Sequence, residues 1–141
     1  MYRDAEGRDW RLVVTVSTLE RCRSQAEYDP MRLVHEGEMH RLMLDPVLLA
    51  SLAWCCVEDE ARTRGVDRRA FVDAARGDAL DRLFDAFLSE FASFFPSTKA
   101  AMVSKAGREV AAAYSRAMSA PDDSGAASTS WPASPASTLA A

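Results

Sequence analysis

The clearest pattern of apolar positions lies between Asp78 and Phe95, where leucines and phenylalanines recur at steps of three and four residues. Polar residues occupy the positions between them, so the pattern predicts an amphipathic helix with one buried face, and an aromatic stripe of this kind is typical of core packing. Pro96 ends the pattern, because a proline steers the residue before it away from helical dihedrals. The apolar face comprises Leu80, Leu83, Phe84, Phe87, Leu88, Phe91, Phe94 and Phe95.

A second helix is predicted from Pro46 to about Arg64. Asp45 is a favourable N-cap, Pro46 suits the first helical turn, and Gly65 suits the C-terminal cap. Apolar residues cover most of the circumference of this helix, which predicts that it is largely buried. The acidic run from Glu58 to Glu60 is expected to mark its solvated end.

The N-terminal residues favour β structure. Tyr2 and Arg3 precede a turn-like stretch, Asp4–Gly7, which is followed by the β-branched, strand-like segment Trp10–Val16. This pattern predicts a β-hairpin. Because a lone hairpin is marginally stable in water, it must pack against helices.

Shorter helices are predicted between the hairpin and the long helices. The motif S-x-x-E at Ser17–Glu20 fits a capping box, in which the Ser and Glu side chains satisfy amide donors of the first turn. The helix that it starts is expected to end near Gln25 or Tyr28, because Pro30 steers Asp29 away from helical dihedrals. Further short helices are expected at Met31–His35, Glu38–Leu44 and, after an Asp67 cap, Arg68–Arg76.

The last helix is predicted from Ser97, as its cap, to about Met118. Its apolar positions follow steps of three and four residues, and most of them are small. Such a row, here called the seam, permits close approach of another helix but buries little area per residue. The pattern leaves open whether the seam packs on the same domain or binds a partner helix. The seam comprises Val103, Ala106, Val110, Ala113 and Ala117.

Together these elements predict a mainly α (α+β) fold, with a small N-terminal β-hairpin and a compact bundle of about five to six helices. Residues 1–118 are expected to form this helical domain. From Ser119 the composition changes to serine, alanine and proline without lysine or arginine. Residues 119–141 are therefore expected to be a disordered tail, because they bury too little apolar surface to offset the entropy of ordering.

Composition narrows the classes of function. The net charge of −4 and the pI of about 5.2 argue against nucleic acid as a partner, because such binding relies on a basic surface. No apolar run is long enough for a membrane span, and the polar N-terminus is not that of a signal peptide. Cys22, Cys55 and Cys56 are interpreted as buried thiols in a reducing, cytoplasmic compartment, with a redox or nucleophilic role as the alternative.

Both histidines occur in HEGEMH, His35 to His40, which differs by one residue from the metalloprotease spacing H-E-x-x-H. On a helix, two side chains at this separation would point roughly 140° apart, and Gly37 disfavours a helix interior here. We interpret the segment as a surface or helix junction, with a metal site as the alternative. Since the sequence also lacks the glycine motifs of phosphate sites and the G-x-S-x-G elbow, we expect no catalytic residue, metal or cofactor.

The order of these segments resembles a known family. RDWRLVVTVSTLERCR is similar to the opening strand and helix of small proteins encoded in phage and prophage tail-gene clusters. DPVLLASLAWCCVEDEARTRGV, AFVDAARGDALDRLFDAFLSEFASFFP and the Ala-rich last helix follow in the same order. Over roughly residues 8–118 the chain resembles the tail assembly chaperones of long-tailed phages. The resemblance lies in helices, caps and the DPVLL and FFP landmarks, and it carries no catalytic signature.

This resemblance implies a non-enzymatic chaperone that acts in the cytoplasm of a bacterial host and is absent from the mature virion. Its implied partners are the helical tape-measure protein, which such chaperones coat, and the tail-tube protein, which they help recruit. A homo-oligomer is compatible with the pattern. One alternative is a structural head–tail connector, tail completion protein or other small assembly adaptor. The other is a small enzyme or metal protein built on His35, His40 and the cysteines.

Overall fold

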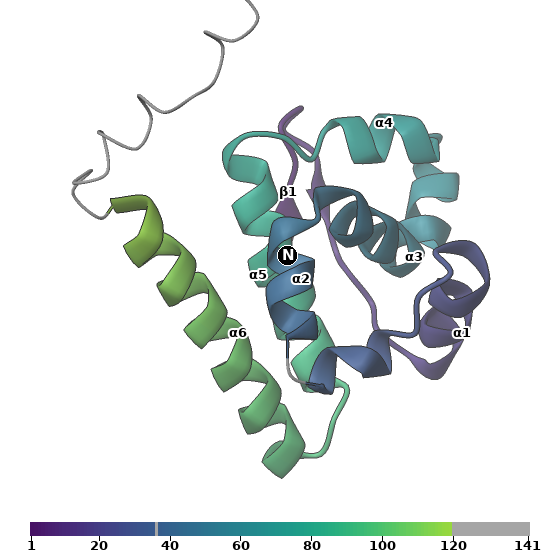
Figure 1. Ribbon diagram of the computed structural model, residues 1–141. Helices are drawn as coiled ribbons and strands as arrows, with labels where there is room; N and C mark the ends of the chain where they lie inside the picture. Colours follow the sequence, from purple (N-terminus) through teal and green to yellow (C-terminus); the bar gives the residue numbers. More distant parts are fainter. Residues whose placement is uncertain (36, 120–141) are drawn as a thin grey trace, which may run out of the picture.

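The computed structural model describes residues 1–35 and 37–119, which form a two-stranded hairpin packed against six α-helices and one 3-10 helix (Figure 1). This arrangement confirms the predicted mainly α fold. The tail expected beyond Ser119 lies outside the described residues. The elements are β1 (Tyr2–Arg3), β2 (Asp9–Trp10), α1 (Val16–Gln25), η1 (Pro30–Val34), α2 (Glu38–Leu44), α3 (Pro46–Arg64), α4 (Arg68–Asp73), α5 (Asp78–Ser93) and α6 (Ser97–Ser119).

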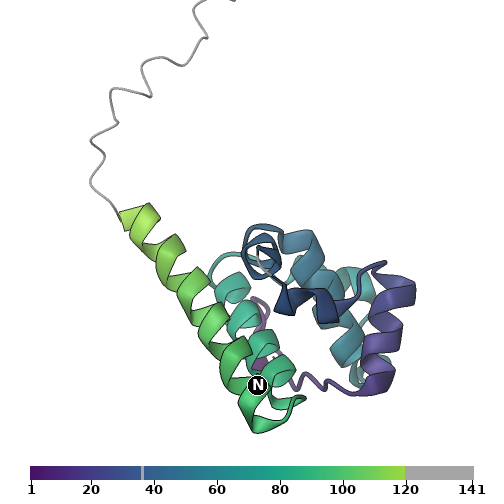
Figure 2. The ribbon, with the colours of Figure 1, turned by 60° about the horizontal axis from the view of Figure 1, so that its bottom comes forward.

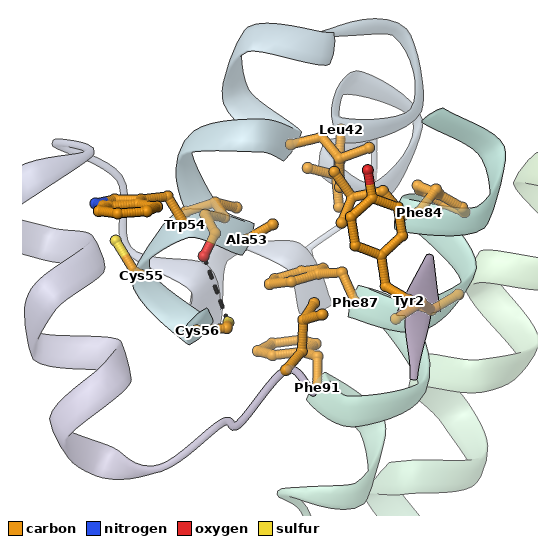
Figure 3. Packing of buried hydrophobic residues seen from close by; sticks show 14 of the residues in the cluster. Tyr2, Leu42, Ala53, Trp54, Cys55, Cys56, Phe84, Phe87 and Phe91 are labelled. Carbon is orange, nitrogen blue, oxygen red and sulfur yellow. Dashed lines mark hydrogen bonds between the residues drawn. The ribbon is translucent and has the colours of Figure 1, made fainter. Parts of the chain in front are cut away.

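The core forms around α3, which contacts α1, α2, α4 and α5. Its ends are those that the sequence predicts: the Asp45 carboxylate accepts the Leu48 amide at 3.0 Å, and Gly65 adopts the left-handed conformation at φ 72°. Figure 3 shows Ala53 of α3 facing Phe87 of α5, with Tyr2 of β1 close by. The aromatic stripe of α5 is thus core packing, as its pattern indicates.

The hairpin is shorter than its sequence pattern predicts. Its two strands pair antiparallel, with Tyr2 opposite Trp10, and the strand does not continue to Val16. Beyond Trp10 the backbone turns to α3, where the Val13 amide donates to the Cys56 carbonyl at 3.1 Å. The strand-like residues therefore bury Leu12 against helices, and within residues 1–35 and 37–119 there is no third strand for them to pair with.

Asp4 holds the hairpin turn together. Its carboxylate accepts the Glu6 and Arg8 amides, both at 2.9 Å, the Arg8 guanidinium at 2.8 Å and the Trp10 indole N–H at 3.0 Å. Burial raises the pKa of this carboxyl, but the hydrogen bonds to Trp10 and Arg8 outweigh burial and hold the pKa below its ordinary value. The hairpin then packs on α4, where the Trp10 and Phe71 rings meet edge to face at 5.3 Å.

The capping box predicted at Ser17–Glu20 is wrong. The N-cap of α1 is Thr15, whose hydroxyl oxygen accepts the Thr18 amide at 3.3 Å. Thr18 is buried, and its own hydroxyl donates to the Val13 carbonyl at 2.9 Å. Starting the helix at Val16 puts the Thr18 hydroxyl within reach of the Val13 carbonyl, and Ser17 is left exposed in the first turn.

Two further helix ends differ from the prediction. α4 ends at Asp73 instead of Arg76. Beyond it the Ala75 amide donates to the Val72 carbonyl at 3.1 Å, and the Ala74 carbonyl accepts the Ala5 amide of the hairpin turn at 2.9 Å. α5 ends at Ser93, although Phe95 still belongs to the core with 9% of its surface exposed.

The acidic run near the end of α3 is only partly solvated. Glu58 is buried, with 5% of its surface exposed, and accepts the Arg62 guanidinium at 2.6 Å, whereas Asp59 is exposed. The expectation of a fully solvated helix end is therefore wrong for Glu58, because packing around α3 covers one more turn than the sequence suggests.

Candidate interaction site

The predicted seam lies partly against the body of the protein and partly in solvent. Val103 is buried, Ala106 and Val110 are half-buried, and Ala113 and Ala117 are exposed. α6 packs on α5 and α2, and its C-terminal turns extend past the other helices in both ribbon views (Figures 1 and 2). The N-terminal half of the seam is thus largely packed within the domain, and the described residues leave its C-terminal half uncovered.

Gly107 determines how closely α6 approaches α5. It is buried, and a Cβ placed on it would lie 1.8 Å from Cδ2 of Leu88. A glycine costs an α-helix about 1 kcal/mol relative to alanine, so its place in the interior of α6 is explained by this contact. The close approach at Gly107 sets the position of α6, and with it the position of the seam.

An apolar groove of about 670 Å³ lies between α6 and the segment formed by η1 and α2. We call it the α6 groove. Four of the five seam residues line it, and Ala117 does not. This volume is within the range of ligand pockets in proteins, which are typically lined by apolar side chains. The other apolar lining residues are Met31, Leu33, Val34, Met39, Phe95 and Met102.

Large apolar side chains at the α6 groove are exposed. Met102 of α6 exposes 72% of its surface and Val34 of η1 exposes 53%. Uncovered apolar surface beside a groove is typical of a site for a partner or for another segment of the chain. The α6 groove is therefore the candidate interaction site of the described residues.

The polar residues of the α6 groove are few. Lys99 lines one end of the α6 wall, and Glu109, farther along, lies 3.9 Å from Lys105 in an exposed ion pair. His35, which follows η1, and His40 of α2 belong to the opposite wall. An exposed pair of this length contributes little stability, so the Glu109 carboxylate, which lines the groove, is available to a ligand there.

The structure brings both histidines to the same groove, but not into a metal-binding arrangement. Both are exposed, and among residues 1–35 and 37–119 no three His, Cys, Asp or Glu side chains gather as metal ligands would. Here the histidines are polar groups at the edge of an apolar surface.

The three cysteines are buried, as the sequence predicts. The Cys56 thiol donates to the Leu52 carbonyl at 3.4 Å (Figure 3), and burial raises the pKa of this thiol. Interaction with the Cys55 thiol, followed by burial, raises the pKa of Cys22. The same interaction lowers the pKa of Cys55 and outweighs burial, which acts in the opposite direction. Since reactive thiols are usually accessible, these residues are suited to packing in the core.

A smaller hollow of about 520 Å³ lies on another face of α6. Met43, Phe84, Tyr114 and Met118 supply its apolar surface, and Asp81 and Asp85 of α5 supply carboxylates. Burial, followed by the neighbouring Asp81 charge, raises the pKa of Asp85. The two faces of α6 therefore differ in charge: two carboxylates line the smaller hollow, whereas Lys99 and Glu109 line the α6 groove.

The sequence pattern identified one wall of the α6 groove and missed the other. Met31, Val34 and Met39 lie more than fifty residues before the seam, and nothing in their local pattern connects them to it. The sequence could have identified Met102, because it lies four positions before Ala106 and residues four apart share one face of a helix.

Among the described residues, no helix is both long and apolar enough to cross a membrane. Comparison with protein-family models, with curated proteins and with solved structures finds no match to the chain.

Proposed function

We propose that the chain is a phage tail assembly chaperone that holds an amphipathic helix of the tape-measure protein in the α6 groove. The observation that carries the proposal is the groove itself, an uncovered apolar surface beside a helix with small side chains. The resemblance in the order of helices, caps and landmark motifs names the family. Helix-in-groove binding is the mode that this geometry favours.

The dimensions of the α6 groove suit a helix. Its α6 wall runs from Lys99 to Ala113, and fourteen residue steps of an α-helix span about 21 Å. This length corresponds to about four turns of a bound helix. Ala106 and Ala113 leave room for the close helix axes, about 8–10 Å apart, that small contact residues permit.

The charge of α6 defines the partner further. The helix carries four cations and one carboxylate, Glu109, in a chain whose net charge is −4. Lys99, Arg108 and Arg116 form no ion pair with any residue that the structure describes. We expect the bound helix to carry Asp or Glu beside its apolar stripe, because complementary charge steers association and disfavours other partners.

Two substitutions on adjacent residues test the site. Ala113 is exposed and lines the α6 groove, whereas Ala112 is exposed and does not line it. Each is replaced by Glu in a tagged chain co-expressed with the longest helical protein encoded near its gene. We expect Ala113→Glu to reduce co-purification of that protein at least tenfold, and Ala112→Glu to leave it near the wild-type level. Ala106→Glu places the same charge deeper in the groove.

Three results decide the proposal. If the long protein stays insoluble and unbound with the wild-type chain, the chaperone function is wrong. If both Ala variants bind equally well, the function stands but the α6 groove is not the site. Mass spectrometry of purified particles separates a chaperone, which is absent from them, from a connector, which remains in them.

A further inference from the structure

We infer that the chain's own C-terminal segment, residues 120–141, occupies the α6 groove when no partner is bound, with Trp131 as its apolar anchor. Only one part of the inference rests on the proposed function, namely that the segment competes with the partner helix for the groove. Occupancy itself is a property of the isolated chain and is measured without any partner.

The position of the segment supports this occupant. α6 ends at Ser119, six residues after Ala113, which lines the groove. From Ser119 back to Ala106 the distance along the helix is about 20 Å. Twelve residue steps separate Ser119 from Trp131, and a chain of that length reaches at most about 40 Å. Trp131 can therefore reach the middle of the groove even after the chain reverses direction.

The composition of the segment also fits. Pro121 and Gly125, residues that favour turns, stand between the end of α6 and Trp131. Asp122 and Asp123 are the only charged residues of the segment, and they follow a helix whose last turn carries Arg116. Trp131 is its only aromatic residue, and a tryptophan buries roughly 150–250 Å² of surface.

Tethering makes even weak docking effective. A short linker gives its two ends an effective concentration in the millimolar range, so an intrinsic dissociation constant of about 1 mM occupies roughly half of the molecules. A partner then meets a partly filled groove, and its apparent affinity falls in proportion to the unfilled fraction. We therefore expect removal of Trp131 to strengthen partner binding two- to fivefold.

Methionine methyl groups report on occupancy directly. Met31, Met39 and Met102 line the α6 groove, and a docked indole ring shifts their resonances. The experiment compares full-length wild type with full-length Trp131→Ala, both labelled with carbon-13 at the methionine methyl groups. Ser130→Ala is the matched control in the same segment. Met1, which is 84% exposed and does not line the groove, serves as an internal reference.

We expect Trp131→Ala to shift at least two of the three groove methyl resonances, at any protein concentration, and Ser130→Ala to leave them in place. Identical spectra for wild type and Trp131→Ala would overturn the inference. Shifts that grow with protein concentration would also overturn it, because they would place the tryptophan of a second copy in the groove. Failure of tape-measure binding leaves these spectra unchanged, so the two proposals fail independently.

Discussion

Gly107→Ala tests how α6 is held against the core. A Cβ at this position would lie 1.8 Å from Cδ2, 2.9 Å from Cγ and 3.0 Å from Cδ1 of Leu88. Because the branch atom Cγ is among these contacts, rotation of one methyl group does not relieve the clash. Either the whole Leu88 side chain moves or α6 shifts away from α5.

Two opposing terms determine the size of the effect. Alanine stabilises a helix interior by about 1 kcal/mol relative to glycine. Extra volume in a packed interface costs typically about 1–3 kcal/mol. Leu88 is buried, with 8% of its surface exposed, so it has little free space into which to move. We expect Gly107→Ala to lower the free energy of unfolding by roughly 1 kcal/mol, the difference between the two terms.

Urea denaturation of a double-mutant cycle measures both terms. In a Leu88→Ala background the clashing atoms are gone, so Gly107→Ala should raise the free energy of unfolding by about 1 kcal/mol. The sign of the effect thus reverses between backgrounds, with a coupling energy of about 2 kcal/mol. If Gly107→Ala stabilises the wild-type background as well, Gly107 does not set the approach of the helices and this reasoning is refuted.

Two further predictions concern the N-terminal region. Asp4→Asn removes hydrogen bonds to a buried ionised carboxylate, and we expect it to lower the free energy of unfolding by about 1.5–3 kcal/mol at pH 7. The pKa of Asp4 in the folded state lies below its ordinary value, so its stabilisation is complete at neutral pH and is lost as the pH falls below about 4. Urea titrations at several pH values should therefore show that acid lowers the free energy of unfolding less in Asp4→Asn than in wild type. An equal loss in both proteins would contradict the assignment. Thr15→Ala should lower the free energy of unfolding by about 0.5–2 kcal/mol, and Ser17→Ala should lower it much less, because Thr15 is the N-cap. Thermal unfolding of both variants measures the difference. The reverse order would favour the capping box at Ser17 instead.

Local signals accounted for most helix boundaries. Glu38–Leu44 and Pro46–Arg64 agree with the prediction because their ends depend on neighbouring residues. The Asp45 cap needs only an amide three residues later, and Gly65 needs only its freedom to adopt positive φ. Interactions within one or two turns are present in any fold that contains these segments.

Predictions failed where the deciding partner was distant in sequence. The strand-like residues after Trp10 pair with α3 through the Cys56 carbonyl, more than forty positions away. Directly after α4, the Ala74 carbonyl accepts the amide of Ala5, which lies about seventy positions earlier in the chain. Glu58 is covered by packing that its helical pattern does not encode. Backbone groups in the interior take whichever partner the assembled fold supplies.

The sequence by itself determined the helical class, the buried face of α5 and the small residues of α6, because periodicity and capping act within a few residues. Only the tertiary structure decided that α6 packs on α5 through Gly107 and that η1 and α2 form the other wall of the groove. A groove is the space between segments far apart in the chain. Its shape therefore depends on how closely they pack, and no local pattern contains that distance.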